Sequence, residues 1–159
     1  MGGAVAGGLI AGRTAPRRTM IGFAIAGAIA DLDLLFGVHS GPTHGLGSAV
    51  IAGVITWVVW ANLPASRAAF RIALATAAAY ATHTLLDWLS TDTSAPFGIM
   101  ALWPLSSEYY ISALHVFLPV SRRYWLADAW LLNLRAVIRE SLILGPLLWI
   151  VWWTRAEHR

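Results

Sequence analysis

Four side chains that could bind a metal ion lie within one short stretch of an otherwise apolar sequence. Asp31 and Asp33 supply two carboxylates, and His39 and His44 supply two imidazoles a few residues later. Ionisable groups are expensive in an apolar or membrane environment, where they usually mark a functional position or compensate one another. This stretch is therefore the first candidate site.

A second pair of candidate ligands comes later in the sequence. His83 and Asp87 are four residues apart, so on a helix their side chains share one face and can bind one ion. The alternative for these two residues is a structural ion pair without metal. Together with the first stretch, they favour one shared metal site.

The two aspartates of the first stretch can be used in two ways. Asp31 and Asp33 are two residues apart, so they converge only if the helix that carries them ends or unwinds. Carboxylates held close together repel each other unless a cation lies between them. Either both bind the metal, or Asp31 binds it while Asp33 caps a neighbouring helix or orients a ligand histidine.

The turn formed by Gly41, Pro42 and Thr43 can bring the two histidines that flank it to face one point. Thr43 is expected to cap the helix that begins near His44. The full candidate ligand set contains only nitrogen and oxygen donors, and cysteine is absent: Asp31, Asp33, His39, His44, His83 and Asp87. This set suits Zn²⁺ best, with Mn²⁺, Fe²⁺ or Mg²⁺ as alternatives, and it could hold one or two ions.

Metal sites with such ligands can catalyse hydrolysis. A divalent metal lowers the pKa of a bound water molecule, which then attacks the substrate, and a nearby carboxylate can act as the base. We predict catalytic roles for Asp33 and Asp87, and replacing either one with asparagine should abolish turnover of a phosphoester. Asp92 and His115 are weaker candidates for proton transfer.

The composition is that of a membrane protein. The 159 residues are 58% hydrophobic and 12% charged, and this length suits a single domain. The formal net charge of +3 comes from arginine alone, since lysine is absent. Because the arginines are scattered in ones and twos, they form no continuous basic stripe for nucleic acid. We expect membrane lipid as a partner and no direct contact with nucleic acid.

Hydropathy predicts an all-α, multi-pass transmembrane helical bundle that forms a single membrane-embedded, hydrolase-like domain over residues 1–159. About 20 apolar residues can cross a bilayer as a helix. Residues 2–12 are either half a span or the end of a span that begins upstream of Met1. Residues 90–133, rich in proline and aromatic residues, are predicted to be interfacial or re-entrant. Spans are predicted near residues 19–38, 46–63, 68–89 and 136–153.

Alternating span directions place every candidate ligand on one side of the membrane. The arginines of the short loops and the carboxyl end lie on the other side, and such residues favour the cytoplasm. They are Arg13, Arg17, Arg18, Arg67, Arg71, Arg155 and Arg159. We therefore predict a multi-pass protein of the inner (cytoplasmic) membrane whose site faces the extracytoplasmic side.

The order of the motifs resembles that of a known family. Its elements here are Asp31-Leu32-Asp33, His39-Ser40-Gly41-Pro42-Thr43-His44, His83-Thr84-Leu85-Leu86-Asp87 and Leu102-Trp103-Pro104. This order is similar to that of the membrane-bound metal-dependent hydrolases, also described as LexA-binding, inner-membrane-associated hydrolases. That family usually has arginine after the first histidine and serine after the second, whereas this chain has Ser40 and Gly45. The resemblance implies a hydrolase without naming its substrate.

The substrate class is inferred from the surroundings of the site. Arg122 and Arg123 lie on the predicted site side and can bind a phosphate or an anionic headgroup by bidentate contacts. Alternatively, they only anchor the chain to anionic lipid. We expect hydrolysis of a lipid-linked phosphoester. The alternative function is a non-catalytic, metal-stabilised membrane protein that acts in regulation through a protein partner.

Overall fold

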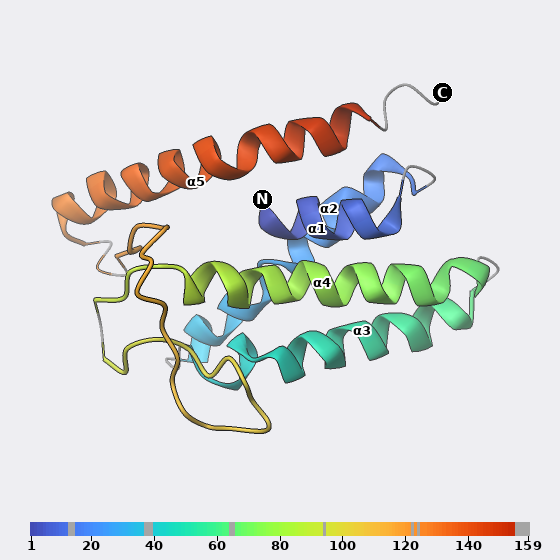
Figure 1. Ribbon diagram of the computed structural model, residues 1–159, viewed down its shortest axis with the longest axis horizontal. Helices are drawn as coiled ribbons and strands as arrows, with labels where there is room; N and C mark the ends of the chain where they lie inside the picture. The colour runs from blue at the N-terminus through green and yellow to red at the C-terminus, as the bar shows by residue number, and fades with distance from the viewer. Residues whose placement is uncertain are drawn as a thin grey trace.

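The computed structural model describes residues 1–12, 15–36, 40–63, 66–93, 95–121, 123 and 125–154. Within these ranges the chain is helical and has no β-strand, which confirms the all-α prediction. The α-helices are α1 (Gly2–Ala11), α2 (Arg17–Ala26), α3 (Leu46–Ala61), α4 (Ala69–Trp88) and α5 (Ala127–Trp153) (Figure 1). Short 3-10 helices lie between them: η1 (Ile29–Phe36), η2 (Pro42–His44) and η3 (Ser66–Ala68).

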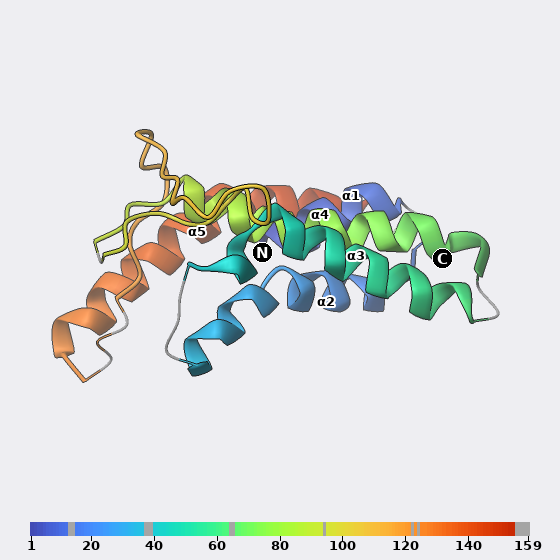
Figure 2. The ribbon, with the colours of Figure 1, turned by 90° about the horizontal axis from the view of Figure 1, so that it is seen from below.

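Helix α4 is the central element of the fold. It packs against α3 and against α1, while α2 and α5 also contact α1, as Figures 1 and 2 show from two directions. Ala75 and Ala79 of α4 are completely buried in the core beside Val5 and Phe23. These small side chains allow the helices to approach one another closely.

Two glycines determine how α1 meets the end of α2. A Cβ atom on Gly3 would lie 2.5 Å from the carbonyl oxygen of Phe23 and 2.9 Å from the Cα of Gly27. Real Cβ atoms essentially never make contacts this short. The contact therefore requires glycine, and it fixes the position of Gly27, whose carbonyl group reaches the candidate site.

The structure corrects the continuous helix that we predicted over residues 19–38. Helix α2 ends at Ala26, and η1 begins at Ile29. After the break, the amide of Ala28 donates a hydrogen bond to the carbonyl oxygen of Ile25. The amide of Asp31 donates one to the carbonyl oxygen of Ala28. These three-residue hydrogen bonds are the tighter 3-10 pattern. Glycine at position 27 favours the break because it is a poor α-helix former.

The other predicted segments are helical with shifted ends. Residues 2–12, 46–63 and 68–89 correspond closely to α1, α3 and α4. Helix α5 begins at Ala127 rather than at residue 136. The charged residues in its first turns lower the hydropathy on which the prediction relied, but they do not prevent an α-helix from forming. The end of the predicted 90–133 segment is therefore helical. None of the described helices combines the length and the hydropathy needed to cross a membrane.

Candidate metal centre

Two histidines from distant parts of the chain face each other near the carboxyl end of α4. His44 ends η2 and is completely buried, His83 lies in α4, and their ring centroids are 4.9 Å apart. The Nε2 atoms of His44 and His83 lie 3.3 and 3.2 Å from Oδ2 of Asp87. The same two atoms lie 3.8 and 3.4 Å from Oδ1 of Asp31. Both imidazoles thus point their Nε2 atoms at the same two carboxylates.

The second nitrogen of each ring, Nδ1, contacts oxygen atoms on the side away from the two carboxylates. Nδ1 of His83 lies 2.9 Å from the carbonyl oxygen of Gly27. Nδ1 of His44 lies 3.2 Å from Oδ2 of Asp33 and 3.1 Å from Oγ1 of Thr43, a hydroxyl group that donates its own hydrogen to Asp33. Because a carbonyl or carboxylate oxygen accepts a hydrogen bond, these contacts assign the proton of each neutral ring to Nδ1. Each Nε2 then directs its lone pair into the site. Metal-binding histidines are commonly oriented in this way.

The distances between these donors fit a divalent metal ion. Two ligand atoms of a tetrahedral zinc site with bonds of about 2.0–2.1 Å are about 3.3–3.4 Å apart. The nitrogen–oxygen distances between the two rings and the two carboxylates range from 3.2 to 3.8 Å. One ligand atom each from Asp31, His44 and His83 lies within 4.8 Å of the others. A cation would also offset the repulsion between the carboxylates.

Three elements hold the ligands in place. Helix η1 carries Asp31 and Asp33, which approach different nitrogens of the His44 ring. Helix α4 supplies His83 and Asp87 from adjacent turns, as their spacing predicts. The hydroxyl group of Tyr80 donates to the carbonyl of the residue before His44 at 2.7 Å, so it ties α4 to η2.

The segment 101–104 supports the turn that precedes α3. The amides of Leu46 and Gly47 donate to carbonyl groups in this segment at 2.9 and 2.8 Å, which satisfies two amides of the first helical turn. A Cβ atom on Gly45 would lie 2.8 Å from the Cβ of Trp103. The Leu-Trp-Pro motif is therefore a structural support, and its close contact explains glycine at position 45.

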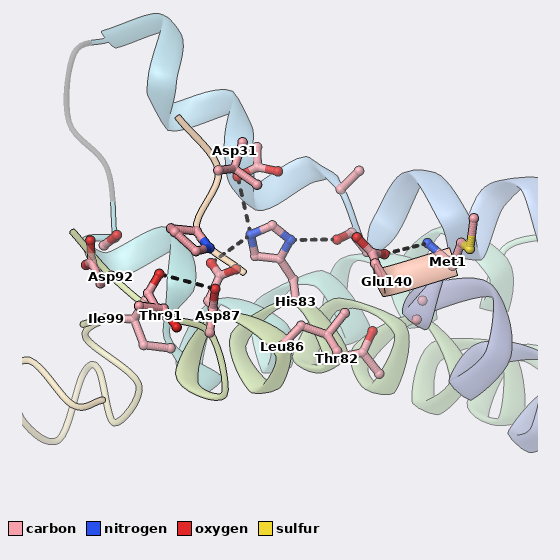
Figure 3. Close-up of a pocket in the computed structure, with 18 of the residues that line it drawn as sticks. Met1, Asp31, Thr82, His83, Leu86, Asp87, Thr91, Asp92, Ile99 and Glu140 are labelled. Carbon is pink, nitrogen blue, oxygen red and sulfur yellow. Dashed lines mark hydrogen bonds and ion pairs between the residues drawn. The ribbon is translucent and has the colours of Figure 1, made fainter. Parts of the chain in front are cut away.

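A cavity of about 410 Å³ is lined by three of the candidate ligands, Asp31, His83 and Asp87. Figure 3 shows His83 with Asp31 and Asp87 to one side and with Glu140 and Met1 to the other. The terminal ammonium group of Met1 lies 3.8 Å from the Glu140 carboxylate. The described side chains that line this cavity include four carboxylates: Asp31, Asp87, Asp92 and Glu140. Their negative charge favours a cation over a free anion.

The structure brings some of the predicted ligands together and separates others. Three can hold one ion, with Asp87 beside them: Asp31, His44 and His83. This is the one such group within the described ranges. Asp33 lies behind His44 and is almost completely buried. His39 lies outside the described residues.

Neither predicted substrate-binding arginine is among the described residues that line the cavity. Arg122 lies outside the described residues, and Arg123 is exposed and is not one of the described residues that line the cavity. Of the weaker proton-transfer candidates, Asp92 lines the cavity and accepts a hydrogen bond from the amide of Gly98 at 2.9 Å. His115 is exposed and outside this lining.

Sequence reasoning missed the groups that orient the histidines. The carbonyl of Gly27 carries no sequence signal, because any residue has a carbonyl group. Thr43 does not cap α3, which begins after Gly45 without a side-chain cap; its hydroxyl instead donates to Asp33 at 2.7 Å. Tyr80 could have been found, because it precedes His83 by three residues on the same helix face.

Substitution of Asp33 with asparagine should weaken metal binding by about 10–100-fold, the usual effect of losing such an orienting carboxylate. Asparagine keeps the shape of the side chain but removes the charge that polarises the His44 ring. Calorimetric titration of the metal-free protein with Zn²⁺ measures the change. Asp128→Asn, an exposed position in the first turn of α5, is the matched control and should bind Zn²⁺ normally. An unchanged affinity of the Asp33→Asn variant for Zn²⁺ would show that Asp33 does not orient His44.

Comparison with known proteins identifies the family of the chain. The model of the family described as YdjM inner membrane protein matches residues 1–158, so the chain belongs to that family and is an inner membrane protein. No curated protein and no solved structure matches. The family description agrees with the inner-membrane part of the sequence prediction, and it names no hydrolase activity.

Proposed function

We propose that this inner membrane protein is a metal-dependent hydrolase. The observation that carries the proposal is the convergence of two histidine Nε2 atoms and two carboxylates at a cavity, with both Nδ1 atoms held from behind. A structural ion pair needs only one histidine and one carboxylate. Two oriented imidazoles in one place are typical of a metal centre.

Asp31, His44 and His83 would hold the ion. Two imidazoles and one carboxylate form a ligand set of zinc hydrolases, so Zn²⁺ is the preferred ion, with Mn²⁺, Fe²⁺ and Mg²⁺ as alternatives. The described residues provide for one ion rather than two. When bound, a divalent ion would activate water and stabilise negative charge on the substrate.

Asp87 is the proposed proton acceptor. Its side chain is 31% exposed and lines the cavity, so it can reach both the ligand cluster and a substrate. Hydrolysis of a phosphoester adds a hydroxyl group to phosphorus, breaks the ester P–O bond and gives a proton to the departing alcohol. Oδ2 of Asp87 would hold that proton between the two events. Asp33, which is almost completely buried, would act only by orienting His44.

A lipid-linked phosphoester is the proposed substrate class. Because the described cavity lining is acidic, the phosphate would bind at the metal rather than through arginines. Ala24 lines both this cavity and an adjoining apolar groove of about 390 Å³, which can take a hydrocarbon chain. The groove lies between α1, α2 and α5 and is lined by Ala4, Met20, Ile21, Ala24, Gly145, Leu148, Trp149 and Trp152.

The test is release of inorganic phosphate by the purified full chain in detergent with Zn²⁺ or Mn²⁺. The substrates are phosphatidic acid, a polyprenyl phosphate and the water-soluble p-nitrophenyl phosphate. We expect release from at least one lipid, faster than from the soluble ester, and loss of release after chelation. No release from any substrate with either metal would contradict the hydrolase proposal.

The ligand geometry also favours a second function, in which metal only stabilises the fold and the protein regulates a partner. The ligands come from η1, η2 and α4, so an ion would join three elements. This alternative predicts that metal stabilises the protein without any turnover of substrate.

We also propose that the chain crosses the membrane several times and that the site faces the extracytoplasmic side. Large apolar side chains are exposed along α3 and α5, as expected for lipid contact: Val50, Val54, Trp57, Val58, Leu134, Leu142 and Trp149. The starts of α2 and α4 lie at the same end of the molecule (Figure 1). Arg18 and Arg71 belong to these starts and line one cavity, whereas His83 and Asp87 lie near the carboxyl end of α4.

Because the chain has no cysteine, single cysteines can report this orientation. Ser107→Cys, in the irregular segment near the site, should react in intact cells with a thiol reagent that does not cross membranes. Asn62→Cys, after α3, should react only after the cells are opened. The reverse pattern would show that the site faces the cytoplasm.

A further inference from the structure

A second large cavity is lined by arginines at the opposite end of α4 from the metal ligands. It has a volume of about 700 Å³. Arg71 and His83 are twelve residues apart on α4, which is about 18 Å along the helix axis. The described lining contains three arginines and no Asp or Glu: Ala11, Ala15, Pro16, Arg18, Thr19, Gly22, Trp60, Arg67, Ala68, Arg71 and Ile72. The charge of this basic cavity is therefore opposite to that of the metal cavity.

The amino-terminal ends of two helices add to the positive potential. Pro16 and Arg18 belong to the start of α2, and Ala68 and Arg71 to the start of α4, and all four line the basic cavity. Figure 1 shows both helix starts at the same end of the molecule. Neither start has a side-chain cap in the structure. A helix amino terminus attracts anions, so side chains and backbone favour the same kind of ligand.

The surroundings of the basic cavity are apolar. Its wall includes Trp60 and Ile72, and large apolar side chains within four residues of the arginines in sequence are exposed. Phe70 is 72% exposed and Leu63 is 44% exposed. A water-soluble anion gains nothing from these apolar side chains. A lipid with a charged headgroup and hydrocarbon chains can use both the arginines and the apolar rim.

We propose that the basic cavity binds the phosphate headgroup of an anionic phospholipid. Arg18 and Arg67 donate hydrogen bonds to the phosphate oxygens, since guanidinium groups match phosphate geometry. Arg71 supports the site from α4, where its Nη1 lies 3.5 Å from the carbonyl of Ala11 at the end of α1. The described residues that line the basic cavity do not line the metal cavity.

Native mass spectrometry of the full chain in detergent tests this proposal. The protein is titrated with phosphatidylglycerol, with phosphatidylcholine, and with phosphatidylglycerol in the presence of inorganic phosphate. We expect tighter binding of phosphatidylglycerol than of phosphatidylcholine. The double variant Arg18→Gln/Arg67→Gln should weaken phosphatidylglycerol binding by roughly tenfold or more, because two charge-assisted contacts are lost.

The matched control is Arg135→Gln/Arg139→Gln, which removes the same charge from exposed positions on α5 and should change binding less than about twofold. Arg71→Gln is a second site variant and should act in the same direction as the first. Circular dichroism and metal content should be unchanged in Arg18→Gln/Arg67→Gln.

Three results would overturn the proposal. Equal weakening by the site and control variants would mean that only net charge matters. Equal binding of phosphatidylglycerol and phosphatidylcholine would show that the cavity does not recognise the anionic headgroup. Displacement of phosphatidylglycerol by an equal concentration of inorganic phosphate would show that the ligand is free phosphate.

Discussion

Replacing Asp87 with asparagine should lower the rate of metal-dependent phosphate release by about 10²–10⁴-fold, the usual contribution of a positioned base. Asparagine has nearly the same shape but cannot accept a proton. Because Asp31, His44 and His83 remain, the variant should still bind metal. Phosphate release under saturating lipid substrate, together with the metal content of the same sample, measures the two effects separately.

The matched control for Asp87→Asn is Asp128→Asn, which removes one carboxylate outside the described cavity lining. It should keep full activity. If Asp87→Asn retains more than about a tenth of the rate of the unmodified protein while holding its metal, Asp87 is not the proton acceptor.

Removal of the metal should destabilise the protein strongly. The ligands come from η1, η2 and α4, so loss of the ion removes a link between three elements. It also leaves the Asp31 and Asp87 carboxylates, which approach the same two imidazoles, without a cation to offset their mutual repulsion. A ligand present at 1,000 times its dissociation constant contributes about 4 kcal/mol to the folded state. For a chain of this size that corresponds to a fall in Tm of roughly 10 °C. Thermal unfolding in detergent, before and after chelation, measures it.

The control for metal removal is the same experiment on His83→Ala. This variant has lost a ligand, so chelator should change its Tm little. An equal fall in both proteins would mean that the chelator acts elsewhere. Stabilisation by metal without phosphate release would favour the regulatory alternative over the hydrolase.

The sequence was most informative where spacing alone determines geometry. His83 and Asp87 share a face of α4 because residues four apart on a helix always do. The turn before α3 places His44 beside them, within reach of η1. The helices themselves follow from long apolar runs, and all the apolar segments predicted from hydropathy contain helix.

The roles of Asp31 and Asp33 could not be separated from the sequence. Their positions depend on the change from α2 to the 3-10 geometry of η1, which lies next to the close contact between Gly3 and Gly27. That contact joins residues far apart in the sequence. The alternative in which Asp33 orients a histidine was open at the sequence level, and the contact with Nδ1 of His44 now favours it.

The surroundings of the site were the least predictable part. The acceptor that orients His83 is the backbone carbonyl of Gly27, and because every residue has such a group, the sequence does not indicate it. We expected Arg123 to bind phosphate because it lies on the predicted site side of the membrane. Whether its side chain lines the cavity depends on the path of the irregular segment before α5, which the sequence does not reveal. Glu140 reaches the cavity from α5, although hydropathy places it inside a predicted span.

The metal content of the purified protein tests the metal centre most directly. Inductively coupled plasma mass spectrometry should find about one transition metal ion, preferably zinc, per chain. His83→Ala should lose it, and His115→Ala, which removes an exposed histidine outside the described cavity lining, should retain it. Absence of stoichiometric metal from the unmodified protein, or its full retention in His83→Ala, would contradict the metal centre.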